Sequence, residues 1–240
     1  MVAQDGIRHH INPSKRQLAR EDERKSTEMT SSLAMFVVAL VACVAHVSGH
    51  GYSTDPPSRS STWRFGFNTP ANYDDNQLWC GGFQTQYNVY GGKCGPCGDS
   101  WGDVVPRANE NTGKYGRGVV TRTYTQGSVI SATFLLTANH KGWVQFSLCR
   151  LSSATQVETN ECFTPLKLAG STSTRYYLPN SNVGETTVKL QLPAGVTCSR
   201  CVIQWHYNTG NSWGVCPDGT GALGCGNQEN FRTCSDVAIN

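Results

Sequence analysis

The stretch from Gly118 to Thr137 decides the fold, and it reads GVVTRTYTQGSVISATFLLT. In its second half, every second residue from Ile130 to Leu136 is apolar, and Ser131 and Thr133 lie between them. Alternation over this length is typical of a β-strand with one buried face and one exposed face. This stretch therefore predicts a long strand whose apolar face is turned toward a core.

Three later stretches repeat the strand pattern: WVQFSLCRL at 143–151, TTVKLQLP at 186–193 and CVIQWHYN at 201–208. The sequence TANHKG at 137–142 joins the first two clear strands as a tight turn ending in Gly142. Residues 50–117, in contrast, are rich in Gly, Pro, Asn and Asp, which predicts long loops with at most short helical turns. Together these features predict an all-β fold, an immunoglobulin-like β-sandwich with long disulfide-stapled loops.

The composition narrows the class of protein. Of 240 residues, only 15% are charged and 38% are hydrophobic, with 25 glycines and 11 cysteines. This is a loop-rich composition with too few helix-forming residues for a helical bundle. The formal net charge of +3 is too small to indicate a nucleic-acid partner. Six basic residues precede the apolar run described next, so the remainder is close to neutral: Arg8, Lys15, Arg16, Arg20, Arg24 and Lys25.

An apolar run at Leu33–Val47 is too short to span a bilayer, which needs about 20 residues. Small residues up to Gly49 follow it, as at a signal-peptidase site. We therefore predict a signal peptide at 29–49, cleavage between Gly49 and His50, and a secreted, extracellular protein. A single-pass membrane anchor is the alternative.

The charged residues 1–28 are predicted to be a disordered N-terminal extension, which is consistent with an upstream start in the gene model. No linker or internal repeat interrupts 50–240, so we expect one mature domain. We also expect a monomer without membrane association once the signal is removed.

Removal of the signal would discard Cys43 and leave an even set of cysteines: Cys80, Cys94, Cys97, Cys149, Cys162, Cys198, Cys201, Cys216, Cys225 and Cys234. An even set in a secreted chain predicts a disulfide framework of up to five bridges, whose connectivity the sequence leaves open. The two motifs CGPC and CSRC offer a structural zinc site as the alternative.

The predicted mature part contains three histidines, His50, His140 and His206. Cleavage after Gly49 would give His50 a free α-amine beside its imidazole, so that one residue could chelate a metal through two nitrogens. A second histidine would complete a set of three nitrogens, which suits copper better than magnesium or calcium. His140 lies in a turn that can present its side chain outward, whereas His206 is predicted to be a solvent-facing strand residue.

Seven motifs in order along 50–240 resemble those of lytic polysaccharide monooxygenases: HGYSTDPPSRSSTWRFGF, NQLWCGGF, CGPCGDSWGD, GKYGRG, TANHKGWVQFSLC, QWHYNTGNSWG and CGNQENFRTCSDV. The chain is most similar to auxiliary-activity family fifteen. The resemblance implies one copper ion, cycling between Cu(II) and Cu(I), in a histidine brace made by His50 and His140. It places Phe231 at an axial position, Ala138 at the opposite axial position and Glu229 beside the metal.

The family also implies the activity, which is oxidative cleavage of glycosidic bonds at C1 or C4 with O2 or H2O2 and an external electron donor. Chitin and cellulose are the expected substrates, and the sequence does not distinguish them. Tyr52, close to His50, is a candidate for stacking on sugar rings.

Three other functions are alternatives to oxidative cleavage. A glycoside hydrolase needs two acids flanking the bond, and the adjacent Asp74 and Asp75 would point apart in an extended segment. A secreted protein that binds chitin or another polysaccharide without oxidising it would suit the same fold. A copper-delivery protein could use the same brace. A histidine at the cleaved terminus together with His140 favours the oxidative enzyme.

Overall fold

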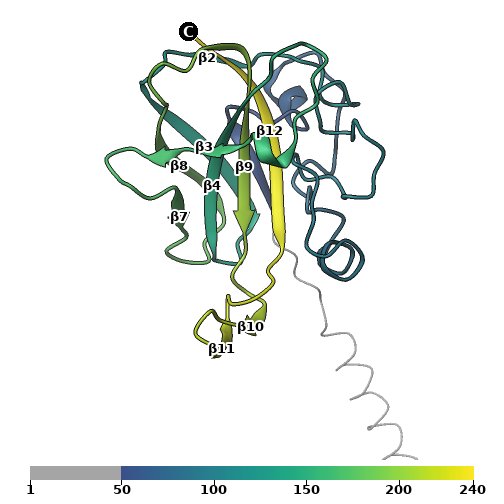
Figure 1. Ribbon diagram of the computed structural model, residues 1–240, viewed down its shortest axis with the longest axis vertical. Coiled ribbons are helices and arrows are strands. Elements are labelled where there is room, and N and C mark those ends of the chain that lie inside the picture. The colour runs from purple at the N-terminus through teal and green to yellow at the C-terminus, as the bar shows by residue number, and fades with distance from the viewer. Residues whose placement is uncertain (1–49) are drawn as a thin grey trace, which may run out of the picture. The chain divides into compact units, whose positions relative to one another are not determined.

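Two β-sheets face each other across an apolar core in residues 50–240, the described part of this computed structural model (Figure 1). The predictions on residues 1–28 and 29–49 lie outside it. The larger strands are β1 His50–Asp55, β3 Val129–Ala138, β4 Trp143–Arg150, β8 Gly184–Gln191, β9 Cys198–Asn208 and β12 Asn230–Ile239. The shorter strands are β2 Arg122–Tyr124, β5 Thr164–Pro165, β6 Lys167–Leu168, β7 Arg175–Tyr177, β10 Trp213–Val215 and β11 Gly221–Leu223.

The smaller sheet has the strand order β1-β3-β8-β6, and the larger has the order β2-β12-β9-β4-β5, with β7 also paired to β4. All of these pairs are antiparallel except β2 with β12. Strands β10 and β11 form a separate hairpin beyond the ends of β9 and β12 (Figure 1). Three short helical turns lie in the loops: η1 Thr62–Phe65, η2 Thr85–Val89 and η3 Asn160–Cys162. No helix among the described residues is long and apolar enough to span a membrane.

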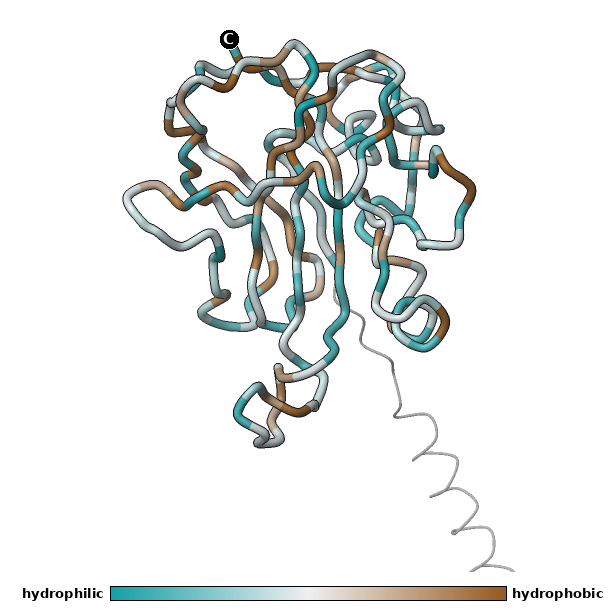
Figure 2. The backbone as a smooth tube through the Cα atoms, viewed as in Figure 1, coloured by the Kyte–Doolittle hydropathy of each residue, from teal (hydrophilic) through white to brown (hydrophobic). Residues whose placement is uncertain are grey.

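Alternating side chains of both sheets fill the core. On β3 the predicted inward residues, from Ile130 to Leu136, are all 5% exposed or less. They pack against Phe146 of β4, Trp205 and Tyr207 of β9 and Phe231 of β12. In Figure 2, teal and brown segments therefore alternate along the strands rather than forming long blocks of one kind. The predicted β-sandwich is confirmed.

Strands β1 and β12 were not predicted. β12 is the central partner of β9, but both of its faces are covered, so polar residues such as Thr233, Ser235 and Asp236 are buried among its apolar ones. A strand covered on both faces has no apolar–polar alternation to detect. β1 contains Gly51, where an added Cβ would lie 2.7 Å from the Leu135 carbonyl oxygen, so close packing on β3 requires glycine there.

All ten cysteines of this part are paired, in five disulfides: Cys80–Cys94, Cys97–Cys234, Cys149–Cys162, Cys198–Cys201 and Cys216–Cys225. The CSRC motif closes on itself, whereas the CGPC motif divides its cysteines between two bridges. With every sulfur in a disulfide, neither motif offers a thiolate to zinc. The Cys97–Cys234 bridge fastens the 94–111 loops to β12.

A buried arginine connects the loop after β1 to the rest of the fold. Arg59 is 2% exposed, and its Nη2 donates to Asp236 Oδ1 at 2.7 Å while its Nη1 donates to Glu158. Burial alone would lower the pKa of Arg59, but the two carboxylates raise it overall. Removing one member of such a group leaves uncompensated buried charge.

We expect Arg59→Ala to reduce the free energy of unfolding by about 3–5 kcal/mol, because two buried carboxylates lose their cation. Arg122→Ala is the control, since Arg122 and its partner Asp55 are both about 40% exposed. An exposed pair contributes only about 0–1 kcal/mol. Urea unfolding with disulfides intact measures both variants, and equal losses would contradict this account.

Candidate metal centre

The pairing of β1 with β3 brings the first residue of β1 to the end of β3. His50 lies opposite Ala138, and a bulge follows between His50 and Gly51. The Gly51 N–H donates to the carbonyl oxygen of Asn76 at 3.0 Å, which holds this end of β1 against a neighbouring loop. His140 comes two residues after Ala138, so both histidines lie at the same end of the sandwich.

The turn that carries His140 is fixed by its backbone. Lys141 and Gly142 both have positive φ, at 57° and 84°. An added Cβ at Gly142 would lie 2.1 Å from the carbonyl oxygen of Asn208, so glycine is required there. The His140 N–H donates to the Tyr207 hydroxyl at 2.8 Å, and the His140 carbonyl accepts from the Gly210 N–H at 3.0 Å. Both backbone groups of His140 are therefore anchored.

The ring of His140 has two polar neighbours at Nδ1. The side-chain amide nitrogen of Asn211 lies at 2.8 Å, and Glu229 Oε2 lies at 3.7 Å. The oxygen and nitrogen ends of the Asn211 amide are nearly alike in shape. With the amide rotated by half a turn, its oxygen accepts a hydrogen bond from the Nδ1–H of His140. That tautomer leaves the lone pair of Nε2 free for a metal ion, which is how outer neighbours orient metal-binding histidines.

His50 lies in a partly apolar setting. Desolvation lowers the pKa of its imidazole; Glu229 opposes this shift, and the nearby His140 adds to it. The two rings are thus within electrostatic range of each other, and the neutral form that binds metals is favoured. The rings of His50 and Phe231 are nearly perpendicular, with centroids 6.3 Å apart and planes at 85°. Phe231 is fully buried and stacks on Tyr207, with centroids 5.8 Å apart.

The structure brings together five of the six predicted site residues: His50, His140, Ala138, Glu229 and Phe231. Tyr52 differs, because it is only 8% exposed within β1 and so has almost no ring face available to a polymer. Tyr52 therefore contributes little to the exposed surface around the histidines.

His206 was predicted to face solvent, but the structure shows it only partly exposed. Its ring packs edge-on against Trp143 with centroids 5.1 Å apart, and its Nε2 lies 2.7 Å from Asn230 Oδ1. Desolvation lowers its pKa to about 3, and the charge of Arg232 contributes to the shift. It therefore stays neutral on the outer face of the larger sheet, partly covered by neighbouring side chains.

Several residues that support the centre were not predicted. Tyr207 and Asn211 fix the turn and the ring of His140. Gln228 is 2% exposed and bonds both backbone groups of Ser212, and it also donates to the carbonyl of Cys225. It thereby ties the β10–β11 hairpin to the same end. All lie in motifs that indicated the family, but no spacing rule marks them out.

The donor chemistry fits copper. Imidazole nitrogens from His50 and His140 suit Cu, Zn and Ni rather than Mg or Ca, and Phe231 adds an apolar wall with no further donor. Within residues 50–240, one other group could in principle share an ion, namely Cys97, Glu158 and Cys234. Its two cysteines are bridged to each other, so it is no metal site.

Comparison with known proteins agrees with this geometry. A family model described as "lytic polysaccharide mono-oxygenase, cellulose-degrading" matches residues 50–237. Among solved structures, the auxiliary-activity family fifteen monooxygenase from Thermobia domestica in its Cu(I) state is similar, with 46% identity and a TM-score of 0.78. The match covers 79% of this chain and 98% of that one. No curated protein matches the chain significantly.

Two further solved structures are similar at much lower sequence identity. The cellulose-active monooxygenase CelS2 in complex with copper is 18% identical with a TM-score of 0.43, covering 80% of this chain and 99% of that one. LPMO10B from Micromonospora aurantiaca is 16% identical with a TM-score of 0.41, covering 79% and 99%.

A disulfide-stapled β-sandwich with two imidazoles at one end, matched over nearly all its described length, defines a copper-dependent oxidative enzyme. The chain belongs to the lytic polysaccharide monooxygenases, and it resembles the auxiliary-activity family fifteen branch. The predictions of the class, of copper as cofactor and of a polysaccharide substrate with an external electron donor are confirmed at this level.

We expect Tyr207→Phe to leave the fold intact but to loosen the His140 turn, because the His140 N–H loses its acceptor. One hydrogen bond of this kind corresponds to about a fivefold increase in hydrogen exchange at the His140 amide. Tyr124→Phe removes a hydroxyl at the opposite end of the sandwich and serves as control. Equal exchange at His140 in both variants would show that the hydroxyl does not anchor the turn.

Proposed function

We propose that this protein is secreted, is cleaved between Gly49 and His50, and oxidises crystalline chitin or cellulose with a copper ion held by His50 and His140. The observation that carries the proposal is the β1–β3 register, which puts His50 opposite Ala138 and beside the His140 turn. Family membership supports the same assignment.

Cleavage matters because an amide nitrogen is a poor metal ligand, whereas a free amine is a good one. An α-amine has a pKa near 8, so a bound metal has only a modest proton affinity to overcome at neutral pH. The amine and imidazole of His50 with the imidazole of His140 would give three nitrogens. The lowered pKa of His50 keeps its ring ready to bind.

When bound, copper supplies the redox chemistry with O2 or H2O2 that removes a hydrogen atom from the sugar at C1 or C4. The chain's own groups have separate tasks in this proposal. Asn211 and the Tyr207 hydroxyl hold the ring and backbone of His140. Glu229 accepts or donates a proton at its carboxylate, which is 14% exposed beside the histidines. Phe231 excludes a further donor, and the small Ala138 leaves room opposite His50.

The substrate surface is proposed to extend from the histidines along the β10–β11 hairpin. Asn211 and Gln228 connect the base of this hairpin to the metal centre, and the Cys216–Cys225 disulfide holds its shape. Trp213 is 68% exposed on β10, and further apolar residues mark the hairpin in brown in Figure 2. An exposed indole offers the flat face that stacks on pyranose rings.

The test is product analysis by mass spectrometry on chitin and on cellulose, each with copper and a reductant. Wild type should release oxidised oligosaccharides from at least one polymer, and the position of oxidation identifies C1 or C4 attack. His140→Ala should release none, because a ligand is lost, whereas Lys189→Ala on the outer face of β8 should match wild type. Full activity in His140→Ala would contradict the ligand assignment.

We expect Trp213→Ala to lower the partition coefficient onto the active polymer by about tenfold, because one stacking platform is lost. Val129→Ala, at the far end of β3 and 53% exposed, is the apolar surface control. Depletion assays with the copper-loaded protein measure both. Equal adsorption of the two variants would remove the hairpin from the substrate surface.

A further inference from the structure

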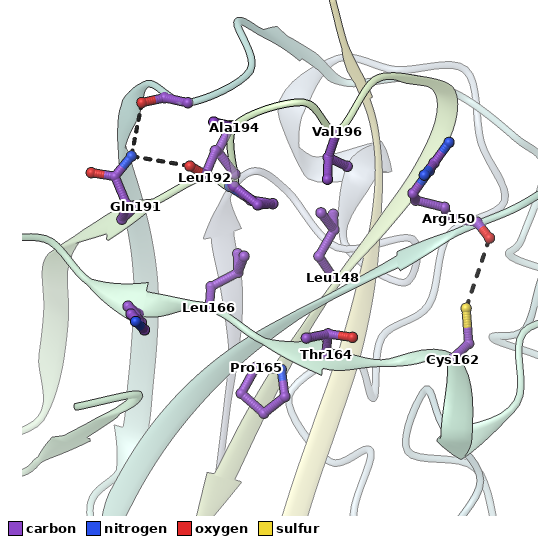
Figure 3. A pocket seen from close by; sticks show the side chains of 13 residues that line it. Leu148, Arg150, Cys162, Thr164, Pro165, Leu166, Gln191, Leu192, Ala194 and Val196 are labelled. Atoms are coloured by element: carbon purple, nitrogen blue, oxygen red, sulfur yellow. Dashed lines mark hydrogen bonds between the residues drawn. The ribbon is translucent and has the colours of Figure 1, made fainter. Parts of the chain in front are cut away.

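A cavity lies at the end of the sandwich away from the histidines. Its volume is about 680 Å³, within the range of about 300–1,000 Å³ that is usual for small-molecule sites. Figure 3 shows Leu148 of β4, Leu166 between β5 and β6, and Val196 of the β8–β9 loop, which all point into it. Leu192 and Ala194, which follow β8, complete the wall (Figure 3), and Pro193 between them also lines the cavity.

The cavity lies far from the two histidines. Arg150 at its edge is the last residue of β4, whereas the His140 turn precedes the first residue of that strand, Trp143. A strand rises about 3.3 Å per residue, so the two ends of β4 lie about 23 Å apart. A molecule in this cavity would not touch the histidines.

The wall of the cavity is aliphatic. Leucine, valine, proline and alanine side chains make up most of the lining, and it contains no aromatic ring. Leu148, Leu166 and Leu192 also belong to the main core, so the cavity is an opening of that core between the ends of the two sheets. An aliphatic chain can fill such a space, whereas a sugar would leave its hydroxyls without partners there.

The edge of the cavity is cationic. Arg150 and Lys167 both line it and are exposed, and within residues 50–240 neither side chain forms an ion pair or a hydrogen bond. No carboxylate side chain is among the lining residues. Alternation along β4 places Arg150 on the same face of the strand as the inward-facing Val144, Phe146 and Leu148. This is an unusual position for a guanidinium without a partner. A guanidinium matches a carboxylate through two parallel hydrogen bonds.

We infer that this cavity binds an aliphatic carboxylate, with its chain between Leu148, Leu166 and Val196 and its head group on Arg150. Lys167 adds a second positive charge at the opening. The apolar wall and the unpaired cations select an amphipathic anion over a neutral sugar or a free inorganic anion. The inference does not depend on the proposed function, because neither histidine takes part.

Isothermal titration with straight-chain carboxylates from hexanoate to dodecanoate, below their micelle concentrations, tests this inference on the chain 50–240 purified without detergent. Each added methylene should tighten binding about fourfold until the cavity is full. Decanol should bind at least about tenfold more weakly than decanoate, because it lacks the charge that pairs with Arg150. Acetate should show no saturable binding.

Two variants locate the site. Ala194→Phe places a ring in the opening and should abolish decanoate binding, and Arg150→Gln should weaken it about tenfold or more. Arg117→Gln, an exposed arginine outside the cavity, should bind like wild type. The inference is overturned if wild type shows no saturable binding, if affinity is independent of chain length, or if Ala194→Phe binds decanoate normally. Circular dichroism checks that each variant is folded.

Discussion

The antiparallel pairing of β1 with β3 is the constraint on which the rest of this structure depends. It places His50 opposite Ala138, and the strand direction then carries the chain into the His140 turn. Gly51 makes the close approach possible, because any larger residue would meet the backbone of β3. A one-residue slip in this register would turn the side chains of β1 to the other face and separate the two histidines.

The same core that holds the sheets together also positions the metal centre. Tyr207 contributes its ring to the core and its hydroxyl to the backbone of His140. Phe231 stacks on Tyr207 and also contacts the ring of His50. A site built on packed rings and strand ends is held more rigidly than one built on loops alone, as a metal with a fixed ligand geometry requires.

Much of the fold could be predicted from the sequence, because β3, β4, β8 and β9 each have one apolar face. β12 could not, since buried partners such as Arg59 for Asp236 satisfy its polar residues, and such pairing is visible only in three dimensions. The histidines of the centre were predictable from a cleavage signal and a tight turn, and the family resemblance added Ala138, Glu229 and Phe231. Asn211 and Gln228 act through contacts that no local pattern records. Alternation along β9 correctly predicted that His206 lies on the outer face of the strand. Its partial burial could not be predicted, because Trp143 and Asn230, which contact it, belong to other strands.

The most direct test of the central claim compares two versions of the chain that begins at His50, one with a free α-amine and the other with that amine acetylated. Titration with Cu(II), followed by electron paramagnetic resonance, measures affinity and the number of nitrogen ligands. The account predicts one tightly bound copper with three nitrogens for the version with the free amine. It predicts binding at least about a hundredfold weaker for the acetylated version, because the nitrogen of His50 is then an amide. Equal affinity and equal spectra for the two versions would contradict it.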